Sequence, residues 1–173
     1  ADIVMGVVAN IFYLDKGYNV KEIATYSKFF GVFATIIGGI IGGYSAIKIG
    51  TLKTLFIGAV IAAASNLLFA WLAVSNTNIN LLITVITADN ISSGFAGAAF
   101  VVYLTALTSI KFTATQYALF SSLMLLLPKV LAGYSGVIVN QIGYANFYIF
   151  TAIIGIPVLL LIIWIAKIAP VKD

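Results

Sequence analysis

The sequence predicts an all-α protein, a polytopic bundle of transmembrane helices. Of its 173 residues, 62% are hydrophobic and 8% are charged, whereas soluble domains are roughly 25% charged. The mean hydropathy is +1.15. Residues 55–72 and 153–168 are apolar on nearly every side, whereas barrel strands alternate apolar and polar residues. Because so few charges could cover a surface in water, we expect the apolar side chains to face a lipid bilayer.

Polar breaks divide the chain into six segments, which we expect to form a single six-helix domain over residues 1–173. A crossing takes roughly 20 residues at 1.5 Å of rise per residue. The first segment is shorter, so we expect a truncated helix. The expected spans are 1–14, 22–46, 52–74, 81–108, 115–139 and 147–168. They are separated by the polar run Asp15 to Asn19, by Lys48 and Gly50, by 75–80, by Lys111 and by 140–146.

The lysines predict the orientation, because short cytoplasmic loops retain Lys and Arg. One side of the predicted bundle collects Lys48, Lys53, Lys111, Lys167 and Lys172. The other side has Lys16, Lys21 and Lys28, all within one loop beside Asp15 and Glu22. Its remaining loops, 75–80 and 140–146, have no lysine. We therefore expect a cytoplasmic C-terminus.

The absent residue types exclude several functions. The chain has no Cys and no His, which removes disulfides, Cys or His zinc sites, haem ligation by His and imidazole-dependent catalysis. The nine lysines and five acids are scattered, so no basic patch would follow a phosphate backbone. We expect no enzyme activity, no cofactor, no metal and no nucleic-acid partner.

Small residues predict close contacts between helices. The run 38–43 contains two pairs of glycines four residues apart, and Gly94 with Ala98 and Ala132 with Gly136 repeat that spacing. Such spacing lets helix backbones approach closely in lipid. Asn66, alone on an apolar segment, is expected to form a hydrogen bond between helices.

Three charged residues fall inside the predicted spans, namely Asp2, Asp89 and Lys129. Charges within a bilayer are costly and mark functional sites by default. At 1.5 Å per residue, Asp89 lies about 12 Å and Lys129 about 16 Å below the outer surface, so the two could reach each other. Steps of three and four bring further residues onto their faces: Ser92, Ser93, Ala96, Phe100 and Tyr103 with Asp89, Ser122, Gly133, Gly136 and Asn140 with Lys129, and Gly6 and Asn10 with Asp2.

Two interpretations of these charges stay open. In the functional one, a carboxylate in a water-filled path is loaded with a proton while a cation and aromatic faces hold a polar solute. In the structural one, a buried Asp–Lys pair only joins two helices.

Two stretches carry a resemblance to a known family. The run 43–50 (GYSAIKIG), ending at Lys53, resembles a degenerate loop signature of the major facilitator superfamily, whose expected aspartate is replaced by Ile47. The run 112–123 (FTATQYALFSSL) resembles the opening of the eleventh helix in AmpG muropeptide permeases. Asp89-Asn90, Lys129, Gly143-Tyr144, Phe147-Tyr148 and 64–66 (ASN) agree with the same family.

The resemblance implies helices seven to twelve of a twelve-helix carrier, with the N-terminal half missing and the first helix clipped. It implies proton-coupled import of anhydromuropeptides from periplasm to cytoplasm across a bacterial inner membrane, by rocking around a midplane site. Asp89 and Asp2 are expected to couple protons. The expected substrate-binding residues are Lys129, Asn90, Ser93, Phe100, Tyr103, Asn10, Gln116 and Ser122. The expected cytoplasmic loop motif comprises Gly43, Lys48, Gly50 and Lys53.

Two alternatives remain. One is a carrier of the same fold for another solute, such as acetyl-CoA, a sugar or a peptide. The other is a non-transporting membrane subunit, in which the Asp–Lys pair is structural.

Overall fold

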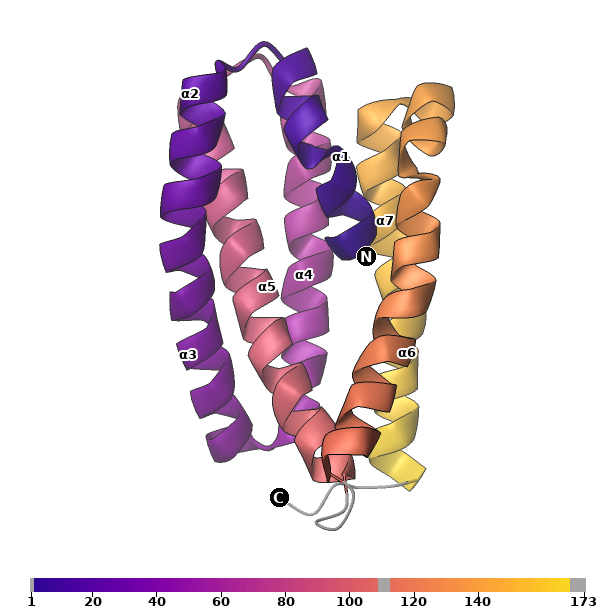
Figure 1. Ribbon diagram of the computed structural model, residues 1–173. Coiled ribbons are helices and arrows are strands. Elements are labelled where there is room, and N and C mark those ends of the chain that lie inside the picture. Colours follow the sequence, from indigo (N-terminus) through magenta and orange to yellow (C-terminus); the bar gives the residue numbers. More distant parts are fainter. Residues whose placement is uncertain (1, 109–112, 169–173) are drawn as a thin grey trace.

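The computed structural model describes residues 2–108 and 113–168, apart from the side chains of Asp2, Thr113 and Leu127. The described residues form helices and short links, which confirms the predicted all-α bundle (Figure 1). The helices are α1 (Asp2–Asp15), α2 (Val20–Ile23), the π-helix η1 (Ala24–Phe30), α3 (Gly31–Ile49), α4 (Thr51–Val74), α5 (Ile79–Leu107), α6 (Thr113–Gly133) and α7 (Ser135–Ile168).

Within the described residues, five helical stretches are long and apolar enough to cross a membrane. They are Val20–Ile49, in which α2, η1 and α3 are continuous, then Thr51–Val74, Ile79–Leu107, Ala114–Gly133 and Ser135–Ile168. The remaining helix, α1, is a shorter apolar helix. Length and composition therefore indicate a multi-pass membrane protein.

The boundary between α6 and α7 lies earlier in the chain than the loop 140–146 that the sequence predicts between the last two spans. The expected span 115–139 is interrupted because α6 ends at Gly133, and Ser135 already begins α7. Inside α7, Gly143 has φ 77° and ψ 165°, so two helical pieces join there. Glycine adopts this backbone region without a Cβ clash. The kink at Gly143 falls within the expected loop 140–146.

Glycines bring α3 and α5 into close contact, which confirms the packing role predicted for the run 38–43. A Cβ on Gly38 or Gly42 would come closer than 3.0 Å to the backbone of α5, and one on Gly94 would meet the backbone of α3 equally closely. By contrast, a Cβ on Gly43 or Gly136 would meet nothing within 4 Å. Only part of the small-residue pattern therefore serves this contact.

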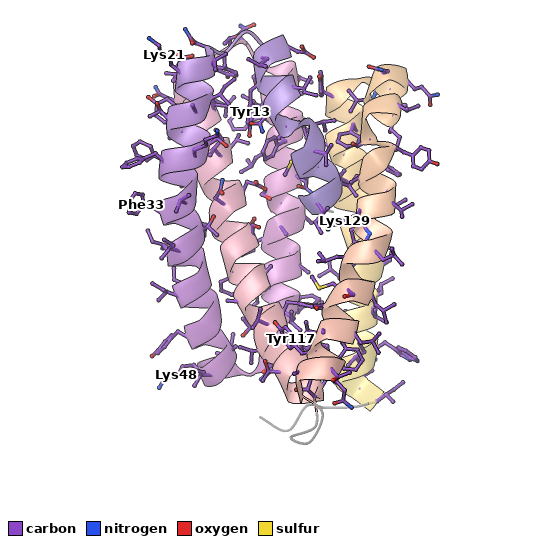
Figure 2. The ribbon with its side chains drawn as sticks, viewed as in Figure 1. Tyr13, Lys21, Phe33, Lys48, Tyr117 and Lys129 are labelled. Atoms are coloured by element: carbon purple, nitrogen blue, oxygen red, sulfur yellow. The ribbon has the colours of Figure 1, made fainter. Side chains whose placement is uncertain are left out.

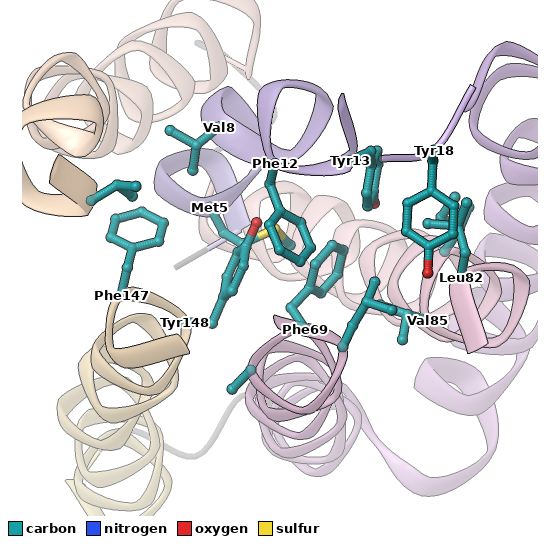
Figure 3. Packing of buried hydrophobic residues seen from close by; sticks show 14 of the residues in the cluster. Met5, Val8, Phe12, Tyr13, Tyr18, Phe69, Leu82, Val85, Phe147 and Tyr148 are labelled. Atoms are coloured by element: carbon teal, nitrogen blue, oxygen red, sulfur yellow. The ribbon is translucent and has the colours of Figure 1, made fainter. Parts of the chain in front are cut away.

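The largest cluster of buried side chains surrounds α1. Phe12 packs against Tyr148 of α7 at 5.1 Å between ring centroids, and Tyr148 packs against Phe69 of α4 at the same separation. Figure 3 shows these rings with Met5 and Tyr13 between the ribbons of α1, α4 and α7. Aromatic rings in such tilted and edge-on pairs add to the apolar burial. The short helix α1 is thus held by aromatic side chains on its neighbours.

Hydrogen bonds join the connections at one end of the bundle. The Lys16 amine donates to the carbonyl oxygen of Ala73 at 2.7 Å, and the Tyr18 hydroxyl donates to that of Asn78 at 3.0 Å. The Tyr144 hydroxyl donates to Asp15. The end of α1 and the polar residues that follow it therefore contact the end of α4, the link between α4 and α5, and Tyr144 of α7. The opposite end of the bundle carries Lys48 (Figure 2).

Candidate functional site

The candidate site centres on Asp89, which lies in α5 and is half-buried. The Ser65 hydroxyl on α4 donates to Asp89 Oδ1 at 3.3 Å, but it also lies 2.9 Å from the carbonyl oxygen of Ala62. The Ser92 hydroxyl lies 3.3 Å from that of Ser65 and donates to the backbone carbonyl of Asp89 at 2.8 Å. A hydroxyl has one proton to donate, so this chain of oxygens can shift its donors when the carboxyl group gains or loses a proton.

Asn90, the next residue on α5, is tied to α3. Its amide oxygen accepts from the Thr35 hydroxyl at 3.0 Å, and its amide nitrogen donates to the Ile86 carbonyl at 2.8 Å. A Cβ on Gly31 would lie 3.1 Å from the Asn90 amide. Asn90 therefore holds α3 beside the candidate site.

The residues predicted to share the Asp89 face of α5 differ in their exposure. Ser92 is buried against α4, whereas Ser93 is exposed. Phe100 and Tyr103 are half-buried, with their ring centroids 6.3 Å apart. Asp89 and the two rings thus share one partly open face of α5, as the helical spacing predicts.

The structure does not bring Asp89 and Lys129 together. Lys129 is exposed four residues before the end of α6 (Figure 2), and no ion pair between the two is present in the described part of the chain. At the end of the bundle far from the connection between α5 and α6, α1 packs against both α6 and α7 and lies between α4 and α6 (Figure 1). The suggestion that Asp89 and Lys129 could reach each other therefore stays a prediction.

The other expected substrate-binding residues are spread over two helices. On α6, Ser122 is exposed and Gln116 is half-buried. On α1, Asn10 is exposed. The side chain of Asp2, which is expected to couple protons with Asp89, lies outside the described residues.

The expected loop motif forms the junction between α3 and α4. Gly50 is the single residue between the two helices and has φ 92°, a conformation that favours glycine. The Lys48 amine lies 5.7 Å from the centre of the Tyr44 ring. Lys53 is exposed in the first turn of α4. This placement puts both lysines at the same end of the bundle.

Two of the fully buried polar groups belong to Asn66, for which the sequence predicted a hydrogen bond, and to Tyr148, for which it predicted no role. Asn66 and Tyr148 have 0% exposure, and neither the Asn66 amide nor the Tyr148 hydroxyl has a hydrogen-bond partner among the described residues. The predicted interhelical hydrogen bond of Asn66 is therefore wrong. Buried polar groups without partners are rare, and Asn66 follows Ser65, which donates to Asp89. The only available signal was the isolated position of Asn66 in an apolar segment.

The π-helix η1 also gave no sequence signal. Its residues Tyr26 and Phe30 have ring centroids 5.6 Å apart, and Phe29 lies 5.2 Å from Phe33 of α3. Lys28, in the same turn, is exposed. Short π-helical segments occur frequently at functional sites. The segment therefore brings an exposed cation and several aromatic rings together within two turns.

Comparisons with known proteins relate the chain to named transporters, although no protein-family profile matches it. It is 35% identical over 166 residues to "Putative transporter AmpG 4" of Rickettsia felis, which is 96% of this chain and 40% of the relative. It is 37% identical over 159 residues to "Putative transporter AmpG 1" of Rickettsia bellii, covering 92% and 39%. The protein of the same name in Rickettsia prowazekii is 37% identical over 162 residues, covering 94% and 37%. Over nearly its whole length the chain is thus a homologue of proteins named AmpG transporters, and it spans about two fifths of their length.

Proposed function

We propose that the chain is the C-terminal six-helix half of a proton-coupled carrier that imports anhydromuropeptides for cell-wall recycling. The observation that carries this proposal is the half-buried Asp89 within the 29-residue apolar helix α5. A carboxylate at that depth is costly, and protonation removes the charge. Asp89 would thus gain a proton from one side of the membrane and release it on the other.

The hydroxyl groups beside Asp89 support this role. Ser65 can donate to the carboxylate or turn to the Ala62 carbonyl, because both acceptors lie within hydrogen-bond distance. The first arrangement favours the charged form of Asp89, whereas the second leaves the carboxyl oxygen available to a proton. Asp2, at the start of α1, is proposed as a second coupling acid.

The proposed solute contacts extend away from Asp89. Phe100 and Tyr103 offer aromatic faces to the sugar rings. The exposed Lys129 is assigned to a solute carboxylate rather than to Asp89, and the absence of an ion pair between the two among the described residues supports this choice. Polar contacts are assigned to Asn10, Asn90, Ser93, Gln116 and Ser122.

We further propose that a second half completes the cavity, because the chain spans about two fifths of its relatives. The carrier would lie in a bacterial inner membrane with the C-terminus in the cytoplasm. The uneven distribution of lysines between the two ends of the bundle supports this orientation, and the difference is larger when Lys16 is not counted. Its amine donates to the Ala73 carbonyl in the last turn of α4, where a cation also favours the helix dipole. Lys48, Lys53 and Lys167 lie towards the opposite end.

Vesicle uptake tests the coupling role of Asp89. We expect Asp89→Asn to abolish uptake of labelled anhydromuropeptide driven by an inward proton gradient, because asparagine cannot carry the proton. The vesicles contain the chain together with an N-terminal half, and each variant is present at the same abundance as the unmodified chain. Asp15→Asn is the matched control, because Asp15 is an exposed acid that accepts from Tyr144 at the end of the bundle, and it should retain uptake.

The same assay separates the alternatives. Uptake that survives in Asp89→Asn would overturn the coupling role. If the unmodified protein is inserted but takes up no muropeptide, a carrier for another solute becomes the better interpretation. Absence of any competition-sensitive solute flux would instead favour a non-transporting subunit.

A further inference from the structure

A groove of about 710 Å³ lies between the N-terminal turns of α4 and the C-terminal turns of α7. Its walls include Leu52 and Phe56 of α4 and Ile162 and Ile163 of α7, and two lysines, Lys53 and Lys167, complete the lining. It belongs to neither the Asp89 site nor the residues proposed to contact the solute. Its chemistry is amphiphilic, with an apolar floor and two cations.

The two lysines have no assigned role in the packing of the bundle. Both are exposed, and neither forms a hydrogen bond or an ion pair with another described residue. Lysine stems can cover apolar surface while the amine remains at a polar boundary. Lys48, at the same end, differs because its amine lies over the Tyr44 ring.

The N-terminus of α4 strengthens the attraction for an anion. Lys53 lies in the first turn of the 24-residue helix α4, where the backbone N–H groups and the helix dipole contribute further positive potential. Lys167 lies in the last turn of α7 and supplies a second cation across the groove. A ligand that matches this arrangement has a negative group next to a long apolar part.

We propose that the groove binds an anionic phospholipid, with the phosphate between Lys53 and Lys167 and an acyl chain along the apolar floor. Lipid fits because the groove is continuous with exposed apolar residues of α7, namely Leu160, Leu161 and Trp164, on a helix that is long and apolar enough to span the bilayer. Basic pockets between membrane helices bind acidic headgroups. The proposal does not depend on the transported solute.

The two tryptophans of the chain provide the test. Trp164 directly follows Ile163, which lines the groove. Trp71 lies in the last turn of α4, at the end of that helix far from the groove. The whole chain is reconstituted in phosphatidylcholine vesicles as Trp71→Phe, which retains Trp164, or as Trp164→Phe, which retains Trp71. Brominated phosphatidylglycerol or brominated phosphatidylcholine is then added at equal fractions, and quenching of tryptophan fluorescence is measured.

We expect brominated phosphatidylglycerol to quench Trp164 preferentially, with about a fivefold gain in relative lipid affinity from each lysine. Trp71 should show no such preference. Lys53→Gln with Lys167→Gln should abolish the preference at Trp164, whereas Lys48→Gln, which removes a charge at the same end but outside the groove, should retain it. Equal quenching of Trp164 by the two lipids would overturn the proposal. A preference that survives the double substitution, or that Lys48→Gln abolishes, would overturn it as well.

Discussion

At the scale of single residues, two asparagines near the candidate site have opposite environments. Asn90 has partners for both its amide oxygen and its amide nitrogen, whereas Asn66 is fully buried and its amide has none. The sequence could place both on apolar helices but could not distinguish them, because a hydrogen-bond partner is a property of the neighbouring helix. A buried amide without a partner is destabilising, whereas removal of a paired amide forfeits its bonds.

The same substitution at the two asparagines should therefore change stability in opposite directions. We expect Asn66→Leu, which keeps a similar side-chain volume, to raise the free energy of unfolding by about 1–3 kcal/mol, the cost of leaving a polar group buried without a partner. Asn90→Leu should lower it by about 1–2 kcal/mol, because two hydrogen bonds are lost. Thermal unfolding in detergent measures both. A fall in the midpoint for Asn66→Leu would mean that the Asn66 amide is satisfied.

At the scale of helices, the sequence predicted the existence of the spans better than their internal geometry. Hydrophobic runs identify helices because every backbone polar group in lipid must be paired within its own segment. They do not encode whether a turn is α or π, so η1 was missed. The hydrophobic runs also could not place the boundary at Gly133, because the residues 130–132 before it and 136–139 shortly after it are apolar or glycine.

The contact between α3 and α5 makes a specific prediction about glycine. A Cβ on Gly94 would fall closer than 3.0 Å to the Thr35 and Gly39 backbone, whereas one on Gly97 would meet nothing within 4 Å. We expect Gly94→Ala to destabilise the bundle by about 1–3 kcal/mol through overpacking. Gly97→Ala, on the same helix, should be neutral or stabilising by up to about 1 kcal/mol, because alanine has the higher helix propensity.

The midpoint of thermal unfolding, followed by far-ultraviolet circular dichroism in detergent, distinguishes these two variants. Equal midpoints would show that α3 and α5 are not in close contact at Gly94.

At the scale of the whole molecule, the prediction about Asp89 and Lys129 shows where sequence reasoning stops. Counting residues along a helix gives each side chain a depth, and the two depths are similar. Depth does not determine which helices are neighbours, and α1 packs against α6 and α7 at the end of the bundle where α5 and α6 diverge. The grouping of Asp89 with Phe100 and Tyr103 was predictable because it depends on one helix alone. The hydrogen bond between Asp89 and Ser65 was not predictable, because it joins α5 to α4.

The orientation of the whole bundle can be tested with single cysteines, because the chain has none of its own. Ile47→Cys introduces a thiol at a position that is 81% exposed, close to Lys48, and Asn76→Cys introduces one in the exposed link between α4 and α5. If the lysine-rich end is cytoplasmic, a membrane-impermeant maleimide should label Asn76→Cys from the outside, and Ile47→Cys only after the membrane is permeabilised. The unmodified chain serves as the unlabelled control. The reverse pattern would place the C-terminus outside and would contradict the proposed direction of import.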